Sequence, residues 1–214
     1  MAIILSLDVS TSVTGICVIE SSRQPDAAGS HILLLDRIEF KGCKTLWDKA
    51  DAVQAYLSSL RSNGRLGGYT DSVRIILEEP LMGFRPGMSS AQTITTLIRF
   101  NGIVSYIARD VFKQEPEYIN APHARKLCGI KLQKTTACGK SQKEQTAEYM
   151  LTCDLKHITW PQTRTGKMVN WAYDAIDAYV IARAAQLSGP IQTPVKKVKK
   201  VVKPKMAKGV TVSP

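Results

Sequence analysis

The sequence has few of the side chains that hold soft metal ions or build a disulfide framework. Its 214 residues include three histidines and no CxxC pair, and the five cysteines are widely spaced (Cys17, Cys43, Cys128, Cys138 and Cys153). An odd, scattered set of cysteines is not typical of a disulfide framework, and these histidines are not spaced as zinc ligands. Any bound metal is therefore expected to be a hard cation held by carboxylate oxygens.

Long hydrophobic runs are also missing. No apolar run reaches the roughly 18 to 20 residues that a membrane-spanning helix needs. The opening MAIILSLDV lacks the basic start and the small-residue cleavage site of a secretory signal. Because the apolar fraction of 44% is ordinary for a globular domain, we expect a soluble, intracellular protein with no membrane partner.

Acidic residues are outnumbered by basic ones, 18 to 29, and the formal net charge is +11. Residues 190–214 contain seven lysines and no acid, which leaves about +4 on the rest of the chain. Such a segment is either a solubilising, disordered extension or a basic arm that neutralises nucleic-acid phosphates. Under both interpretations we predict one folded domain over residues 1–188 and a tail, residues 189–214, outside the fold.

Hydrophobic periodicity divides the chain into alternating strands and helices. A short Ser/Thr turn between the first two apolar runs predicts a hairpin. Three strands come first, and helices and strands then alternate, which predicts an α/β fold with a mixed five-stranded sheet flanked by helices on both faces, as in ribonuclease-H-like proteins. The predicted strands are 2–9, 13–20, 31–40, 73–80 and 117–121, and the predicted helices are 45–61, 89–112, 122–128, 140–152 and 170–187.

Four carboxylates stand in apolar surroundings. Asp8 ends the first apolar run, and Glu78 or its neighbour Glu79 ends the fourth, where strand alternation lets only one of the two face Asp8. Asp174 and Asp177 are three residues apart, so they share one face of an otherwise apolar helix, where an uncompensated acid is costly. Simpler interpretations are an Asx turn at Asp8, a polar strand end at Glu78 and a solvent-facing stripe on the helix.

If the last helix packs across the central strands, these four acids converge. Such a cluster would bind two divalent ions about 3.5–4 Å apart, one activating water and the other stabilising the leaving oxygen of a phosphodiester. We expect Mg²⁺, with Mn²⁺ able to substitute, because Mg²⁺ prefers oxygen ligands and retains waters. The hypothesis is metal-dependent phosphodiester hydrolysis, with Asp8, Glu78, Asp174 and Asp177 as catalytic and metal-binding residues.

The same residues resemble the motifs of the RuvC-like Holliday junction resolvases, nucleases of the ribonuclease-H-like superfamily. MAIILSLDVSTSVTG resembles the family's opening strand pair and IILEEP its second acidic strand, which places catalytic acids at Asp8 and Glu78. YDAIDAYVIA resembles the helix that carries the last two acids, Asp174 and Asp177. The similarity runs in order along residues 1–187.

Basic residues extend the resemblance. GKSQKEQTAEYM resembles the helix start that the family uses for DNA contact, and the chain departs from the family in a longer connector at 129–139 and in the basic tail. An aromatic wedge used by some members at the crossover has only one candidate here. The residues expected to contact nucleic acid are Lys126, Lys140, Arg125, Lys143 and, as the wedge candidate, Phe84.

The resemblance implies an enzyme that resolves four-way DNA junctions by paired, symmetric nicks, with two Mg²⁺ or Mn²⁺ ions per active site. It also implies a homodimer, because two active sites in a two-fold dimer match the two-fold symmetry of the junction. We expect the dimer seam on the helix at 89–112 and no nucleotide cofactor. The expected location is the cytoplasm or another intracellular compartment that contains DNA.

Three alternatives remain. The same chemistry could act on other branched DNA or on RNA–DNA hybrid. LDVSTSVTG also resembles the first phosphate-binding hairpin of sugar kinases and actin-like ATPases, although the chain is short for two such domains and has no later DxG-type hairpin. A non-catalytic DNA-binding protein is disfavoured, because basic segments do not explain four acids in apolar surroundings.

Overall fold

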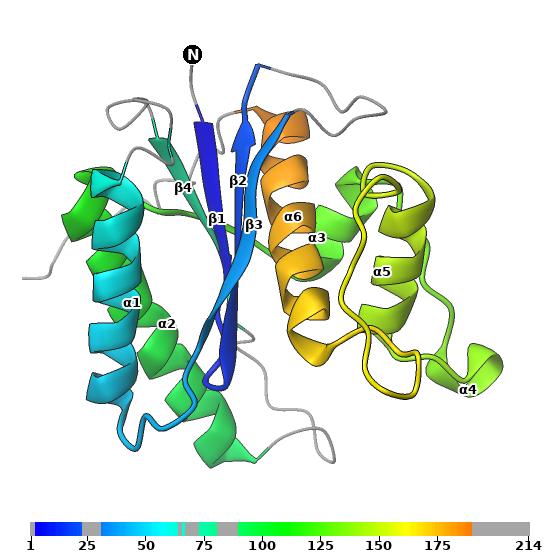
Figure 1. Cartoon of the computed structure of the whole chain (residues 1–214), viewed down its shortest axis with the longest axis horizontal. Coiled ribbons are helices and arrows are strands. Elements are labelled where there is room, and N and C mark those ends of the chain that lie inside the picture. The colour runs from blue at the N-terminus through cyan, green and yellow to red at the C-terminus, as the bar shows by residue number, and fades with distance from the viewer. Residues whose placement is uncertain (1–2, 23–30, 64–65, 67–72, 81–89, 190–214) are drawn as a thin grey trace, which may run out of the picture.

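The computed structural model describes residues 3–22, 31–63, 66, 73–80 and 90–189 (Figure 1). The predicted basic tail beyond Gly189 and the wedge candidate Phe84 lie outside these residues. In the described ranges no helix has both the length and the apolar character needed to cross a membrane. The elements are β1 (Ile3–Asp8), β2 (Val13–Glu20), β3 (Ile32–Glu39), α1 (Leu46–Ser62), β4 (Val73–Glu78), α2 (Ala91–Phe112), β5 (Glu117–Ile119), α3 (Ala121–Leu127), α4 (Thr135–Cys138), α5 (Gln142–Thr152) and α6 (Asn170–Ser188).

The five strands form one mixed sheet in the order β3-β2-β1-β4-β5. β1 pairs antiparallel with β2 and parallel with β4, while β2–β3 is antiparallel and β4–β5 is parallel. Helices α1 and α2 cover one face, and α6, with α3 and α5 beside it, covers the other (Figure 1). The predicted mixed five-stranded sheet flanked by helices is confirmed, and every predicted element is present with its ends within two residues.

Strand β1 sends alternate side chains into two separate cores, as the pleat of a strand requires. Leu5 and Leu7 are fully buried in the apolar cluster that β1 shares with α1 and α2. Ile4 belongs instead to the cluster under α6. The Ser6 hydroxyl, on the Ile4 side, donates a 2.6 Å hydrogen bond to the Ala178 carbonyl of α6. Asp8 follows this alternation and lies on the α6 face.

Two helices start at capping boxes that the sequence encodes locally. At α1 the Thr45 hydroxyl accepts from the Asp48 N–H, and the Asp48 carboxylate accepts from the Thr45 N–H. Ser141 and Glu144 form the same reciprocal pair at the start of α5. Because these caps satisfy amides left free by the first turn, they set where each helix begins. The short α4 lies in the connector at 129–139, for which no helix was predicted.

Helix α6 packs directly on the backbone of β2. A Cβ atom added at Gly15 would lie 2.0 Å from the Asp174 carbonyl oxygen, so only glycine permits this approach. Gly15 is also the register partner of Asp8 across the β1–β2 pair. The first turns of α6 are therefore held next to the end of β1, which is the geometry that the four-acid hypothesis needs.

Candidate active site

Asp8 and Glu78 meet at the ends of two neighbouring parallel strands. Leu7 of β1 is in register with Leu77 of β4, so the next residues, Asp8 and Glu78, lie at the same edge of the sheet. Glu78 lies on the same side of β4 as Ile76, a member of the cluster under α6, whereas Glu79 is exposed. The pleat therefore selects Glu78, and not Glu79, as the partner of Asp8.

Asp8 is buried, with 5% of the residue exposed. Burial raises the pKa of Asp8 well above its usual range, and Lys143 opposes that rise. The carboxyl of Glu78, within hydrogen-bonding reach, and that of Asp174 raise the pKa further because like charges disfavour ionisation. Two strand ends and one helix thus bring three acids into direct electrostatic contact.

Asp177 is the fourth member of this group. Asp177 is 7% exposed. Its burial, and to a smaller extent the negative charge of Asp8, raise the pKa of Asp177 to about 6. The positive charges of Lys143 and Arg125 lower this pKa and so oppose the rise. Glu78 and Asp177 also line one small cavity, together with Arg125. The structure thus brings together all four acids that the sequence singled out. We call Asp8, Glu78, Asp174 and Asp177 the acid centre.

The cation in the acid centre is the ammonium of Lys143, which comes from the first turn of α5. Its Nζ lies 2.5 Å from Asp174 Oδ1, 3.3 Å from Asp177 Oδ2 and 3.5 Å from Asp8 Oδ2. We expected Lys143 to add positive charge for nucleic acid, and in the structure this charge is directed at the acids. Arg125 contributes at longer range, with Nη2 3.9 Å from Asp177 Oδ1.

The donor chemistry of the acid centre fits a hard divalent cation. As the side chains stand, no group of three or more His, Cys, Asp or Glu residues in the described ranges is arranged to hold a metal ion. Three of the four carboxylates already share one cation, and all available ligands are oxygens, which Mg²⁺ prefers. Asp8, Glu78, Asp174 and Asp177 are thus the residues that could hold such an ion.

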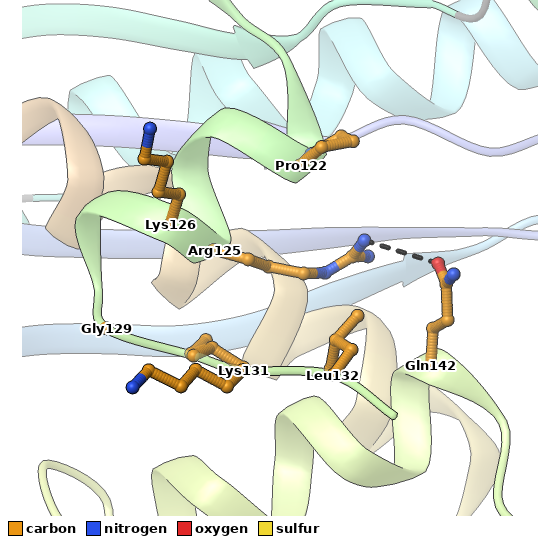
Figure 2. Close-up of a pocket in the computed structure, with 8 residues that line it drawn as sticks. Pro122, Arg125, Lys126, Gly129, Lys131, Leu132 and Gln142 are labelled. Atoms are coloured by element: carbon orange, nitrogen blue, oxygen red, sulfur yellow. Dashed lines mark hydrogen bonds between the residues drawn. The ribbon is translucent and has the colours of Figure 1, made fainter. Parts of the chain in front are cut away.

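Figure 2 shows a basic pocket beside α3. This pocket adjoins the acid centre, because Arg125 lines both the pocket and the small cavity that Glu78 and Asp177 share. It has a volume of about 290 Å³, and Arg125, Lys126 and Lys131 supply its charge. Arg125 joins the two regions, because its Nη1 donates to Gln142 Oε1 at 3.5 Å and its Nη2 faces Asp177. Two of the predicted nucleic-acid contacts, Arg125 and Lys126, therefore line one pocket beside the acids.

Lys140 lies apart from the acid centre. Its ammonium pairs with Glu148 on the exposed side of α5 at 2.6 Å. Lys140 and Lys143 were both predicted to contact nucleic acid, and Lys143, three residues later, is the one that reaches the acids. Sequence patterns alone do not separate these two lysines, because both lie in the same polar helix start.

The sequence analysis did not single out a basic turn between α5 and α6. A bridge between Gln162 and Met168 closes it, and the Thr163 N–H donates to the Lys167 carbonyl at 2.7 Å. Arg164 and Lys167 are exposed at its tip. In the sequence, this turn is marked only by the segment TRTGK, which places two basic residues around a Thr-Gly pair. Because such turns are common in solvated loops, the pattern does not by itself indicate a functional site.

Solved structures of RuvC from Thermus thermophilus have the same architecture. RuvC in complex with a Holliday junction substrate matches with a TM-score of 0.57 and 11% identity, over 87% of this chain and 94% of that one. The chain has the RuvC fold. A second structure of T. thermophilus RuvC matches with a TM-score of 0.53 and 13% identity, over 86% of this chain and 93% of that one.

A crystal structure of the yeast mitochondrial Holliday junction resolvase gives a TM-score of 0.45 at 11% identity, over 86% of this chain and 80% of the yeast chain. No protein-family model matches the sequence, and no curated protein sequence matches it. The likeness to RuvC therefore lies in the arrangement of the backbone. This likeness agrees with the ribonuclease-H-like fold that the order of strands and helices predicted.

Proposed function

We propose that this protein is a divalent-metal-dependent DNA endonuclease that resolves four-way junctions by paired, symmetric nicks. The observation that carries the proposal is the acid centre, in which β1, β4 and α6 bring four carboxylates together from positions up to 169 residues apart. The RuvC fold supports it, because T. thermophilus RuvC with that fold has been solved in complex with a Holliday junction substrate.

In this mechanism the acid centre would hold two Mg²⁺ or Mn²⁺ ions, which would supply an activated water and stabilise the leaving 3′ oxygen. Asp8 and Glu78 are fixed at strand ends and Asp174 and Asp177 on one helix face, so the ligands are positioned by packed secondary structure. Because carboxylates must be ionised to bind a cation, ion binding displaces the protons that burial favours on Asp8 and Asp177.

The basic pocket would hold the DNA backbone beside the acid centre. Lys126 is exposed on α3, and Arg125, which is partly buried, faces both the pocket and Asp177. Phosphate contacts of this kind position a substrate and carry little sequence information. In the same proposal the basic tail, residues 190–214, acts as a separate arm that strengthens DNA binding at low salt.

We further propose that the active unit is a homodimer, with α2 at its seam. Val104 and Ile107 of α2 are buried in the core of a single chain, so they are not free to form an interface. Ile94, Leu97 and Ile98 at the start of α2 remain partly exposed, and they are the residues to test by substitution. A two-fold dimer would present two acid centres to the two equivalent strands of a junction.

The direct test is cleavage of matched four-way, three-way, flap and RNA–DNA hybrid substrates with Mg²⁺. We expect paired nicks at symmetry-related positions of the four-way junction, and none after Asp8→Asn, which should still bind the junction. Preferred cleavage of flaps or hybrids, with unpaired nicks on four-way junctions, would reassign the substrate. Binding of ATP without cleavage of any of these substrates would overturn the nuclease assignment.

A further inference from the structure

The ammonium of Lys143 lies in the acid centre, where divalent ions would bind. We propose that Lys143 acts as an internal counter-ion, which holds the carboxylates together in the metal-free protein and withdraws when divalent ions bind. The inference deepens the proposed function, on which it rests. It assigns Lys143 a positioning role in metal loading, in place of the nucleic-acid contact expected from the sequence.

Geometry is the first support. The Lys143 ammonium is within 3.5 Å of one oxygen from each of Asp8, Asp174 and Asp177, so it lies among the groups that would hold a cation. A divalent ion bound to these oxygens would share their space with the ammonium, and two cations at such distances repel each other. Lys143 and the metal ions are therefore expected to exclude one another.

The attachment of Lys143 is the second support. Its side chain is 46% exposed, so it enters the acid centre from the solvent side of α5 and can leave by the same route. Helix α5 is anchored independently of Lys143 by its capping box and by the buried residues Thr146, Ala147 and Met150. Withdrawal of the ammonium consequently requires rotation of a flexible side chain and no rearrangement of the core.

The need for a counter-ion is the third support. Four carboxylates without a cation would be crowded at one edge of the sheet, where their mutual repulsion would favour opening of that edge. Lys143 supplies this charge before metal arrives, from an element that does not contribute an acid.

Lys140 provides a matched control. It lies on the same helix start, three residues earlier, and its ammonium pairs with Glu148 at 2.6 Å. Lys143→Met and Lys140→Met remove the same charge and leave side chains of similar length. Only the first substitution removes a cation from the acid centre, so a difference between the two variants reports on position and not on net charge.

The experiment measures binding of Mg²⁺ alone to the full chain by titration calorimetry, without DNA. We expect Lys143→Met to bind Mg²⁺ at least about tenfold more tightly than the unsubstituted protein, and Lys140→Met to bind as the unsubstituted protein does. We also expect the metal-free Lys143→Met protein to melt at a lower temperature than the unsubstituted protein. Added Mg²⁺ should raise the melting temperature of the variant by more than it raises that of the unsubstituted protein. Equal or weaker Mg²⁺ binding by Lys143→Met would overturn the inference.

A second measurement needs no variant. Lysine acetylation of the unsubstituted protein, followed residue by residue by mass spectrometry, should label Lys143 slowly without metal and about tenfold faster with Mg²⁺. Lys140 should not change, and NaCl at matched ionic strength should not reproduce the effect. Labelling of Lys143 that is unaffected by Mg²⁺ would refute withdrawal, even if Lys143→Met does not fold.

The two measurements separate failure of this inference from failure of the proposed function. Mg²⁺ binding that Asp8→Asn abolishes but Lys143→Met leaves unchanged would keep the metal centre and reject the counter-ion role. An unsubstituted protein and a Lys143→Met variant that both bind no Mg²⁺ would reject both proposals together.

Discussion

The two faces of the sheet are built from the same strands and differ in what they bury. On the α1–α2 face, the side chains of β1 and β4 that enter the core are apolar, with Leu5, Leu7 and Leu77 fully buried. On the α6 face, the same strands present Ser6, Asp8 and Glu78 beside their apolar residues. One face thus holds the sheet together by apolar packing, while the other combines packing with the polar groups of the proposed active site.

Buried polar groups on the α6 face are paired with one another across elements. The Tyr179 hydroxyl of α6 donates to Asp154 at 2.9 Å and lies 2.9 Å from Nε2 of His31, while Arg183 is 3.5 Å from Asp154. Buried polar groups are tolerated when their hydrogen bonds are satisfied. Helix α6 is therefore fixed to the sheet by hydrogen bonds and an ion pair as well as by apolar contact. Such fixation suits a helix that carries two of the acids in the acid centre.

The largest difference between the two faces of the sheet is expected from one substitution on each face of β1. Asp8→Asn removes one of the proposed metal ligands, so junction cleavage should fall by at least about 10²–10³-fold while junction binding persists. Leu5→Ala, on the other face, should lower the free energy of unfolding by about 2–5 kcal/mol and leave the turnover of folded molecules near normal. Gel cleavage assays and urea unfolding measure the two effects.

The corresponding substitution at the other three acids tests which residues belong to the acid centre. Glu78→Gln, Asp174→Asn and Asp177→Asn should behave like Asp8→Asn, because each acid is in electrostatic contact with at least one other. A variant that cleaves at a near-normal rate would remove that residue from the centre. Glu79→Gln is the control, since Glu79 is exposed and lies on the opposite side of β4.

A glycine on each side of the sheet gives the second test. Gly15→Ala would place a Cβ atom 2.0 Å from the Asp174 carbonyl, so α6 must move away from β2. We expect a loss of several kcal/mol in unfolding free energy and a loss of cleavage, because the helix acids move with the backbone, as overpacking costs typically about 1–3 kcal/mol or more.

Gly102→Ala is the matched control for Gly15→Ala. Gly102 lies in α2, and a Cβ atom there would meet nothing within 4 Å. Since alanine favours a helix over glycine by about 1 kcal/mol, this change should leave stability unchanged or raise it slightly. A similar loss from both substitutions would contradict the close approach of α6 to β2.

Stability of the metal-free protein should depend on pH through the α6 face. The pKa of Asp177 is raised to about 6, so the folded state retains a proton that the unfolded state has already lost. The free energy of unfolding should therefore fall as pH rises from about 4 to about 7. Ionisation of Asp177 should account for a loss of roughly 3 kcal/mol over this range. Urea unfolding at several pH values measures this slope.

Two changes should flatten the pH dependence. Asp177→Asn removes one of the two acids whose pKa is raised and leaves Asp8, so it should reduce the slope, while Mg²⁺ compensates the ionised carboxylates and should flatten the slope further. Substitutions on the α1–α2 face, such as Leu5→Ala, should shift the curve downward without changing its shape. If Asp177→Asn leaves the slope intact, then Asp177 does not carry the raised pKa.

The smallest expected effect concerns the basic pocket. Lys126→Ala removes one predicted phosphate contact, so the slope of log affinity against log salt should decrease in magnitude by about one, with cleavage at saturating enzyme unaffected. Arg109→Ala, on α2 and paired with Glu115, is the control on the other side of the sheet. Filter-binding or fluorescence titrations at several salt concentrations would show whether the two variants differ.

Local sequence signals predicted most of the secondary structure. Capping boxes at Thr45 and Ser141 set where α1 and α5 begin, and apolar runs set the strands, because these features act over a few neighbouring residues. The acids Asp8, Asp174 and Asp177 could be selected for a similar reason, since each interrupts an apolar pattern that its own segment defines. The choice between Glu78 and Glu79 could not be made, because it depends on how β4 pairs with β1.

The order of strands and helices, the positions of the unusual acids and the excess of positive charge all follow from residue type and local spacing, and they could be read from the sequence. That Lys143 and not Lys140 reaches the acids, and that Gly15 brings α6 against β2, became visible only in the folded chain. Those outcomes depend on contacts between residues more than 30 positions apart, whose relative placement comes from packing.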